Sequence, residues 1–275
     1  MNKNEMLKYL QHGAEITGGL VGGAIGALGG PEGAVIGGGV GVAISCGLKE
    51  VVGKVLSQRE IVRIAASADY MISGVQGRLN AGESVRRDGF FDYSEGRSSA
   101  SELFEGTLVK CKDQYQEKKI KYISKIFEKA IFDEKISPET ANQLISMADS
   151  FTYRKLCVLS FFGNIVGCDR KNELMQEPYR FYPHIEFNLE LEILKQDIFD
   201  LSNLGLIDAN NTLMTSNCDI MPGKMELSGI GQELFRILGL NEIEEHELAK
   251  LFELLKFKSE YGASVHGTVN GEMKT

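Results

Sequence analysis

The stretch GAEITGGLVGGAIGALGGPEGAVIGGGVGVAISCGLKE, residues 13–50, decides how the start of the chain folds. Its glycines recur every four residues in two series, which are separated by a break at Gly30-Pro31-Glu32. Because residues four apart lie on one face of an α-helix, each series would form a smooth groove that lets another backbone approach closely. The pattern predicts a glycine-zipper helical hairpin suited to membranes or to self-association. The glycines expected at its packing face are Gly18, Gly22, Gly26, Gly30, Gly33, Gly37 and Gly41.

The composition of this stretch argues against a flexible linker. A glycine in a water-exposed helix costs roughly 0.8–1.0 kcal/mol relative to alanine, and residues 16–30 hold seven glycines. Lipid, which forbids unpaired backbone groups, or tight packing can offset that cost. A flexible linker would be rich in serine and polar residues, whereas the larger residues here are leucine, valine and isoleucine. The linker interpretation therefore fails.

The length of the two arms leaves two interpretations open. Ile16–Gly29 and Ala34–Leu48 would each span only ~21–22 Å, which is short of the ~30 Å hydrocarbon core of a bilayer. One interpretation is an oligomeric hairpin that thins the bilayer or lines a pore. The other is a hairpin buried within a soluble bundle or oligomer.

Capping sequences predict a helical bundle over residues 57–150. In a capping box, a serine side chain accepts from the backbone three residues on, and a glutamate at that position reaches back. A serine followed by proline is a further start signal, because proline fits the first helical turn. The expected helices run from Ser57–Glu60 to about Asn80, from Ser99–Glu102 to about Phe132, and from Ser137-Pro138 to Asp149.

Residues 151–240 mix helical periodicity with short strand-like pieces. A helix over 152–162 is followed by one over 186–203, which ends before Gly205, a natural helix stop. Ser228 then caps a further helix. The short strands expected between these helices are 206–207, 212–215 and 224–227. This order of elements resembles a winged-helix domain.

The chain as a whole is thus expected to be mainly α. Its start lacks the features of a signal peptide, and no apolar run reaches the ~18–20 residues of a clean transmembrane helix. We expect a cytoplasmic protein that can associate with the inner membrane. The expected parts are a glycine-zipper hairpin at 1–56, a helical bundle at 57–150, a winged-helix-like α+β domain at 151–240, a C-terminal helix at 241–258 and a disordered tail at 259–275.

No motif in the sequence supports catalysis or a metal site. The four histidines are far apart, and no two of the five cysteines have C-x-x-C spacing. The glycine segment contains G-x-x-x-x-G matches without the lysine that completes a phosphate-binding loop, and G-x-S-x-G is absent. We therefore expect no catalytic residue, no metal ligand, no cofactor and no enzymatic activity.

The most distinctive loop contains Arg86, Arg87, Asp88, Phe90 and Phe91. In one interpretation the two arginines bind an anionic partner and the two phenylalanines enter an apolar pocket of that partner. In the other, the phenylalanines fold back onto the bundle while the aspartate pairs with an arginine.

Charge argues against nucleic acid as a partner. The chain has a formal net charge of −8, and residues 150–240 hold 8 Lys and Arg against 12 Asp and Glu, a net of −4. The helix expected at 186–203, which would be the recognition helix of a winged-helix domain, holds five acidic residues and Lys195 as its one base. Groove binding relies on neutralising phosphates, which this surface would repel. A protein partner fits this domain better.

Several segments within residues 13–160 carry a further resemblance. They are the glycine-rich start, Ser57-Gln58-Arg59-Glu60, Arg87-Asp88-Gly89-Phe90-Phe91, Ser101-Glu102-Leu103-Phe104-Glu105-Gly106, Glu117-Lys118-Lys119-Ile120 and Tyr153-Arg154-Lys155-Leu156-Cys157. In these segments and in the order of its parts, the chain resembles an uncharacterised family of bacterial glycine-zipper proteins associated with phage defence and abortive infection. The resemblance brings no catalytic residues. It implies an effector whose glycine hairpin acts at the inner membrane while the C-terminal domains sense or restrain.

Three functions follow as hypotheses. The first is a non-enzymatic bacterial effector that forms homo-oligomers and perturbs or docks to membrane lipid through its glycine hairpin. The second is a soluble adaptor or regulator with a protein-binding winged-helix domain. The third, a transcriptional regulator, is disfavoured by the acidic recognition helix.

Overall fold

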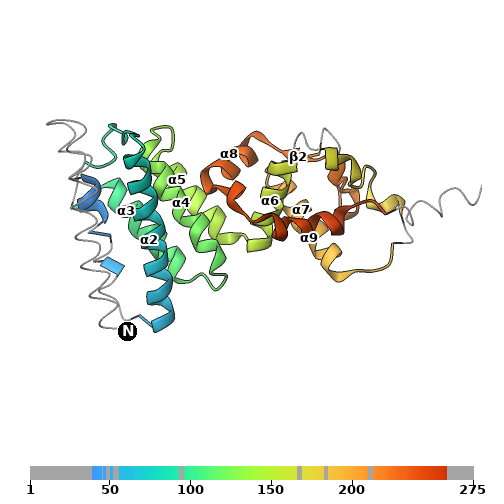
Figure 1. Cartoon of the computed structure of the whole chain (residues 1–275), viewed down its shortest axis with the longest axis horizontal. Helices are drawn as coiled ribbons and strands as arrows, with labels where there is room; N and C mark the ends of the chain where they lie inside the picture. Colours follow the sequence, from blue (N-terminus) through green and yellow to red (C-terminus); the bar gives the residue numbers. More distant parts are fainter. Residues whose placement is uncertain are drawn as a thin grey trace, which may run out of the picture. The chain divides into compact units, whose positions relative to one another are not determined.

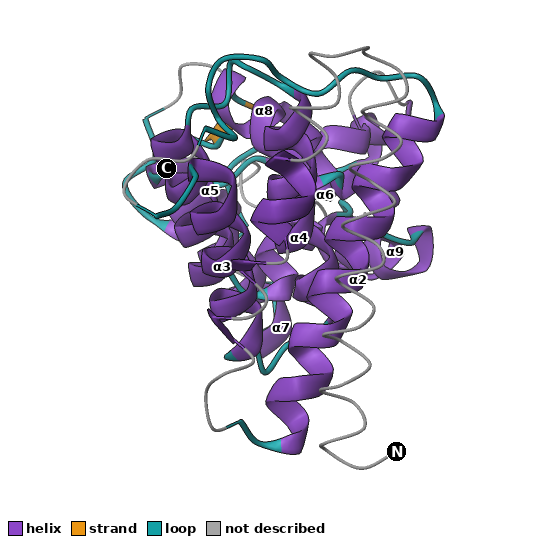
Figure 2. Ribbon diagram, turned by 90° about the vertical axis from the view of Figure 1, so that its left-hand side faces the viewer, coloured by secondary structure: helices purple, strands orange, loops and turns teal. Residues whose placement is uncertain are grey.

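The computed structural model describes residues 39–44, 46–47, 50–51, 56–92, 96–165, 169–182, 185–209 and 213–258. The chain divides into two compact units, Met1–Thr152 and Tyr153–Thr275 (Figure 1). Nearly every described element is a helix, so the expected mainly α class is confirmed (Figure 2). The expected tail lies outside the described residues, as do the first arm of the expected hairpin and Gly18, Gly22, Gly26, Gly30, Gly33 and Gly37.

Four long helices form the core of the first unit. Two of them, α2 and α4, pack side by side, α3 packs against both, and α5 packs against α3 and α4. The bounds are α2 (Gln58–Asn80), α3 (Ser99–Lys112), α4 (Lys118–Phe132) and α5 (Pro138–Ser150).

The helix starts follow the expected capping chemistry in two of three cases. The amide of Glu60 donates to the Ser57 hydroxyl at 3.3 Å, and the Ser57 amide donates to the Glu60 carboxylate at 2.7 Å. Ser137 caps α5 by accepting from the Thr140 amide at 3.1 Å. The start of α3 was expected one residue too late, because its capping residue is Ser98.

The single helix expected from Glu102 to Phe132 is wrong. The chain forms two helices instead, because α3 ends at Lys112 and α4 begins at Lys118. A continuous helix could bury only one stripe along its length. The break lets both helices pack against α2, so that Leu108 of α3 and Ile123 of α4 are both fully buried.

Aromatic packing and a few polar contacts fix the interior of this unit. The rings of Phe104 and Phe127 meet edge to face at 5.0 Å. The Ser67 and Ser124 hydroxyls share a buried hydrogen bond of 2.9 Å between α2 and α4. Burial raises the pKa of the adjacent Cys111 thiol to about 11. This cysteine therefore stays protonated and behaves as an apolar core residue.

The second unit is built around α6. This helix contacts α7, α8 and α9, and its residues Leu156, Leu159 and Phe162 are fully buried. The α-helices and strands are α6 (Tyr153–Ile165), α7 (Leu189–Asn203), β1 (Ile207–Asp208), β2 (Glu226–Leu227), α8 (Gly229–Leu238) and α9 (Glu245–Leu255). The 3-10 turns are η1 (Asp169–Glu173), η2 (Tyr179–Phe181), η3 (Asn217–Asp219), η4 (Pro222–Lys224) and η5 (Leu240–Glu242).

Two of the three expected strands pair with each other. Strands β1 and β2 are antiparallel, with Ile207 opposite Leu227. The strand expected at 212–215 is wrong for its described part, since residues 213–215 are irregular. The reason is local: the Asp219 carboxylate accepts from the amide and hydroxyl of Thr215 at 2.7 and 2.8 Å and so holds this segment in a turn.

The start of α8 packs directly on the residue that precedes β1. Ser228 accepts from the Gly231 amide at 3.0 Å and donates to the Gly205 carbonyl at 2.5 Å. A Cβ added at Gly231 would lie 2.0 Å from the Leu206 carbonyl oxygen, whereas one added at Gly229 would meet nothing within 4 Å. The glycine at 231 is therefore required by close backbone contact.

Gly231→Ala is expected to lower the free energy of unfolding by about 1–3 kcal/mol, because the new methyl group overlaps a backbone oxygen that cannot move freely. The matched control is Gly229→Ala in the same helical turn, which should be neutral or slightly stabilising. Urea unfolding of both variants checks this, and equal midpoints would contradict the packing described here.

Among the residues that the structure describes, none of the helices combines the length and the apolar character that a membrane crossing requires.

Candidate functional site

The second arm of the expected hairpin is helical where the structure describes it. Residues 39–44, 46–47 and 50–51 are in helical conformation, and we call these residues the glycine helix. Figure 1 shows its pieces in blue beside α3. The buried residues of the glycine helix recur every three or four positions, as one face of a helix requires. They are Val40, Gly41, Ala43, Ile44, Gly47 and Val51.

Two glycines mark the places where this helix comes closest to the bundle. A Cβ at Gly47 would lie 2.9 Å from a ring carbon of Phe104, 3.1 Å from the Ser101 carbonyl oxygen and 3.2 Å from the Glu105 amide nitrogen. These three residues lie on one face of α3. A Cβ at Gly39 would lie 2.8 Å from the Cβ of Phe91. We call these four bundle residues the seat.

The glycines that make these contacts are not those of the expected series. Gly41 is buried, but the seat is met by Gly39 and Gly47, with Ala43 between them. These three form a second series of small residues at four-residue spacing, offset by two positions from the expected one. The sequence contains this series, but the prediction left it out because it did not count alanine with glycine. Small residues of either type permit close helix approach.

The distinctive loop folds back onto the bundle. Arg86 is 4% exposed, and its Nη1 donates to the Ala130 and Ile136 carbonyls at 3.0 and 2.7 Å. Its Nε donates to Asp88 at 2.8 Å, and its guanidinium lies 4.4 Å from the centre of the Phe90 ring. The partner-binding interpretation of Arg86 and Phe90 is therefore corrected: both side chains are buried within the first unit. Their polar and aromatic contacts are with other residues of this unit.

The other two residues of the expected binding set have separate roles. The Phe91 ring is half-buried, stands nearly perpendicular to the Phe90 ring at 5.4 Å, and forms part of the seat. Arg87 is exposed, and its amide donates to the Glu134 carboxylate at 3.1 Å. The loop thus supports Phe91 beneath the glycine helix.

The seat itself is held by several contacts from the bundle. Glu105 forms an ion pair with Arg97, just before α3. The Arg86 amide donates to the Ile131 carbonyl at 3.0 Å, so the loop is tied to the end of α4. Arg86 also holds the pKa of the Asp88 carboxyl below its usual range through their hydrogen bonds. Contacts within the bundle therefore help to hold the seat in place.

No group of three or more His, Cys, Asp or Glu side chains that could hold a metal ion occurs in the described ranges. The chain matches no family model, no curated protein and no solved structure in the comparisons.

Gly47→Leu is expected to destabilise the protein by about 1–3 kcal/mol, since a leucine side chain overlaps the backbone of α3. The matched control is Gly77→Leu on α2, where an added Cβ meets nothing within 4 Å. That change should be neutral or stabilising, because glycine is the poorer helix former. Urea unfolding and trypsin resistance of residues 39–51 measure both. Equal unfolding midpoints and equal trypsin resistance in the two variants would contradict close packing of Gly47 on the seat.

Arg86→Leu is expected to lower stability by roughly 1–3 kcal/mol at neutral pH, because it leaves buried carbonyls without a donor. The folded pKa of Asp88 is depressed, so its contribution is present above the ordinary pKa and is lost as pH falls through the folded value. When the pH is lowered below ~4, the free energy of unfolding should therefore fall less in the Arg86→Leu variant than in the parent. Arg87→Leu, at the exposed neighbour, is the control and should stay within about 0.5 kcal/mol.

Proposed function

We propose that the chain is a non-enzymatic effector whose glycine segment rests on the bundle and, when released, self-associates and perturbs the membrane. The contact between Gly47 and the backbone of α3 carries this proposal. The same small-residue face that lies on the seat is the kind of face that packs helices together in lipid. The bundle and a second glycine segment therefore compete for one surface.

The glycine helix is stable only when its apolar face is buried against another surface. The described glycine helix contains three glycines, which together cost about 3 kcal/mol relative to alanine in water. Burying Val40, Ile44 and Val51 gives back roughly 1.5–3 kcal/mol for each side chain. Burial of these three side chains therefore outweighs the glycine cost. Removed from the seat, the helix would have to bury this face elsewhere.

Release of the glycine segment from the seat is a mechanism that fits the family resemblance. A cytoplasmic effector of abortive infection would keep its glycine segment covered until a trigger separates it from the seat. It would then form homo-oligomers at the inner membrane, where arms too short to cross alone could thin the bilayer or line a pore.

The decisive test weakens the seat from the bundle side. Phe91→Ala removes the ring beneath Gly39 without changing the glycine segment, so it should raise leakage of dye from vesicles of phosphatidylethanolamine and phosphatidylglycerol several-fold. Tyr115→Ala, which removes a 78% exposed aromatic from the same unit, is the control and should leave leakage unchanged.

The glycine spacing is tested separately. Replacing Gly22 and Gly26 by leucine should block close packing between segments and abolish both leakage and toxicity on expression. Unchanged leakage in this double variant would rule out the membrane proposal, and so would a Phe91→Ala variant that resembles the parent.

A second candidate is the soluble adaptor with a winged-helix-like second unit. The order α6, α7, β1 and β2 supports such a domain, with the paired strands as its wing. Phe187, Leu189 and Ile193 are exposed at the start of α7 beside Glu190. An apolar and basic protein surface suits this end better than nucleic acid does.

The structure refines the charge argument for α7. Two of its acidic residues, Asp197 and Asp200, pair with Arg154 and Lys155 of α6. The exposed acidic charge therefore gathers toward the start of the helix, at Glu186 and Glu190. If the chain is a soluble adaptor, it should form a defined oligomer that stays soluble without detergent. Recovery of the full chain only in the membrane fraction would count against it.

A further inference from the structure

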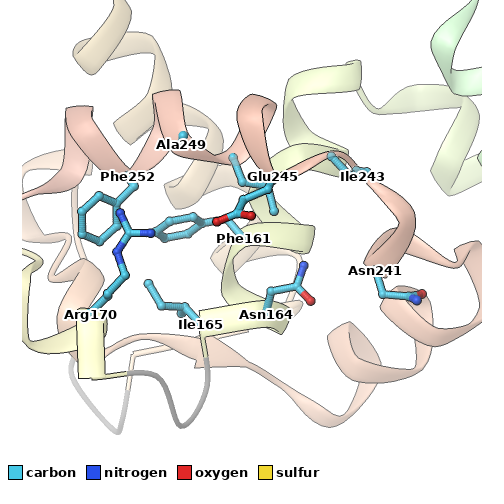
Figure 3. Close-up of a pocket in the computed structure, with 10 residues that line it drawn as sticks. Phe161, Asn164, Ile165, Arg170, Asn241, Ile243, Glu245, Ala249 and Phe252 are labelled. Carbon is cyan, nitrogen blue, oxygen red and sulfur yellow. The ribbon is translucent and has the colours of Figure 1, made fainter.

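A pocket of about 330 Å³ opens in the second unit among α6, η1, η5 and α9 (Figure 3). This volume is within the range of small-molecule sites. Its floor is apolar and buried, whereas its rim carries exposed polar side chains. The floor includes Phe161, Ile165, Ile243 and Phe252, and the rim is formed by Asn164, Arg170, Asn241 and Glu245.

Arg170 differs from the other arginines of this unit. Arg154, Arg180 and Arg236 each pair with a carboxylate, at 2.5, 2.9 and 2.8 Å. Among the described residues, Arg170 has no carboxylate within 4.0 Å, although the unit is acidic. Its guanidinium instead lies 4.0 Å from the centre of the Phe252 ring. Stacking holds the planar cation at the pocket and leaves its donors for an anion.

Glu245 supplies the opposite charge at the same opening. It is the first residue of α9, and it has no ion pair with any residue in the described part of the chain. Figure 3 shows Arg170 and Glu245 both reaching over the floor near the Phe161 ring. The Asn164 amide is oriented by donating to the Ser160 hydroxyl at 3.1 Å. The rim therefore presents one cation and one anion above an apolar floor.

We propose that this pocket binds a free α-amino acid with an apolar or aromatic side chain. The ligand carboxylate would accept from Arg170, the ligand ammonium would donate to Glu245, and the ligand side chain would lie on the floor. A ligand with a single charge would leave one of the two rim charges without a partner, so it would gain only one of the two charged hydrogen bonds. The inference is independent of the function proposed for the glycine segment.

The full chain is titrated with L-phenylalanine and L-leucine, and binding is followed by isothermal calorimetry and by thermal shift. Three analogues each lack one feature: 3-phenylpropionate has no ammonium, phenethylamine has no carboxylate, and glycine has no apolar side chain. Each analogue should bind at least roughly tenfold more weakly than L-phenylalanine, as expected for the loss of a charged hydrogen bond or of apolar contact.

Variants assign the two charges. Arg170→Met keeps an unbranched apolar side chain but removes the guanidinium that stacks on Phe252, and it should weaken L-phenylalanine binding by roughly tenfold to a hundredfold. Glu245→Gln should abolish the preference for L-phenylalanine over 3-phenylpropionate. Arg236→Met, which removes an exposed arginine elsewhere in the unit, is the matched control and should bind as the parent does.

Three results would overturn the proposal. The first is no binding of either amino acid to the parent chain while its thermal unfolding stays cooperative. The second is equal affinity in Arg170→Met and Arg236→Met. The third is binding of 3-phenylpropionate as tight as that of L-phenylalanine, which would show that the ammonium is not recognised.

Discussion

Close backbone contact between the glycine helix and α3 is the constraint that places the glycine helix on the bundle. A Cβ at position 47 would lie 2.9 Å from a ring carbon of Phe104 and within 3.1–3.2 Å of backbone atoms of Ser101 and Glu105, so glycine at this position permits the close contact. Phe104 also meets Phe127 of α4, which places one ring between the glycine helix and the core. Phe104 therefore contacts both the glycine helix and α4.

The seat is formed by segments that are distant in sequence, and this arrangement explains the chemistry of the loop before α3. A buried arginine needs several acceptors. Arg86 finds them in Asp88 and in carbonyls near the end of α4. The loop is thereby fixed, Phe90 is buried beneath the guanidinium, and Phe91 is left in position to meet Gly39. Residues that look like a recognition loop are in this structure the support for an internal contact.

Local signals in the sequence predicted much of the fold, whereas choices between packing partners could not be read from it. The caps at Ser57, Ser137 and Ser228 are contacts between near neighbours, so they are visible in sequence. The break between α3 and α4 is not, because the turn is favoured by what both helices bury against α2. The seat lay beyond prediction for the same reason: glycine spacing shows that a helix can pack closely, but not against what. The pocket beside Arg170 is likewise formed by residues from separate elements, and their spacing in the sequence does not predict it.

Hydrogen–deuterium exchange of the full chain in the absence of lipid tests the central claim most directly. If the glycine helix lies on α3, amides within residues 39–51 should be protected, and Phe91→Ala should lower that protection while α4 keeps its own. Exchange of residues 39–51 at the rate of an unfolded chain, with α3 and α4 fully protected, would contradict the account, because the bundle would then be complete without the glycine helix.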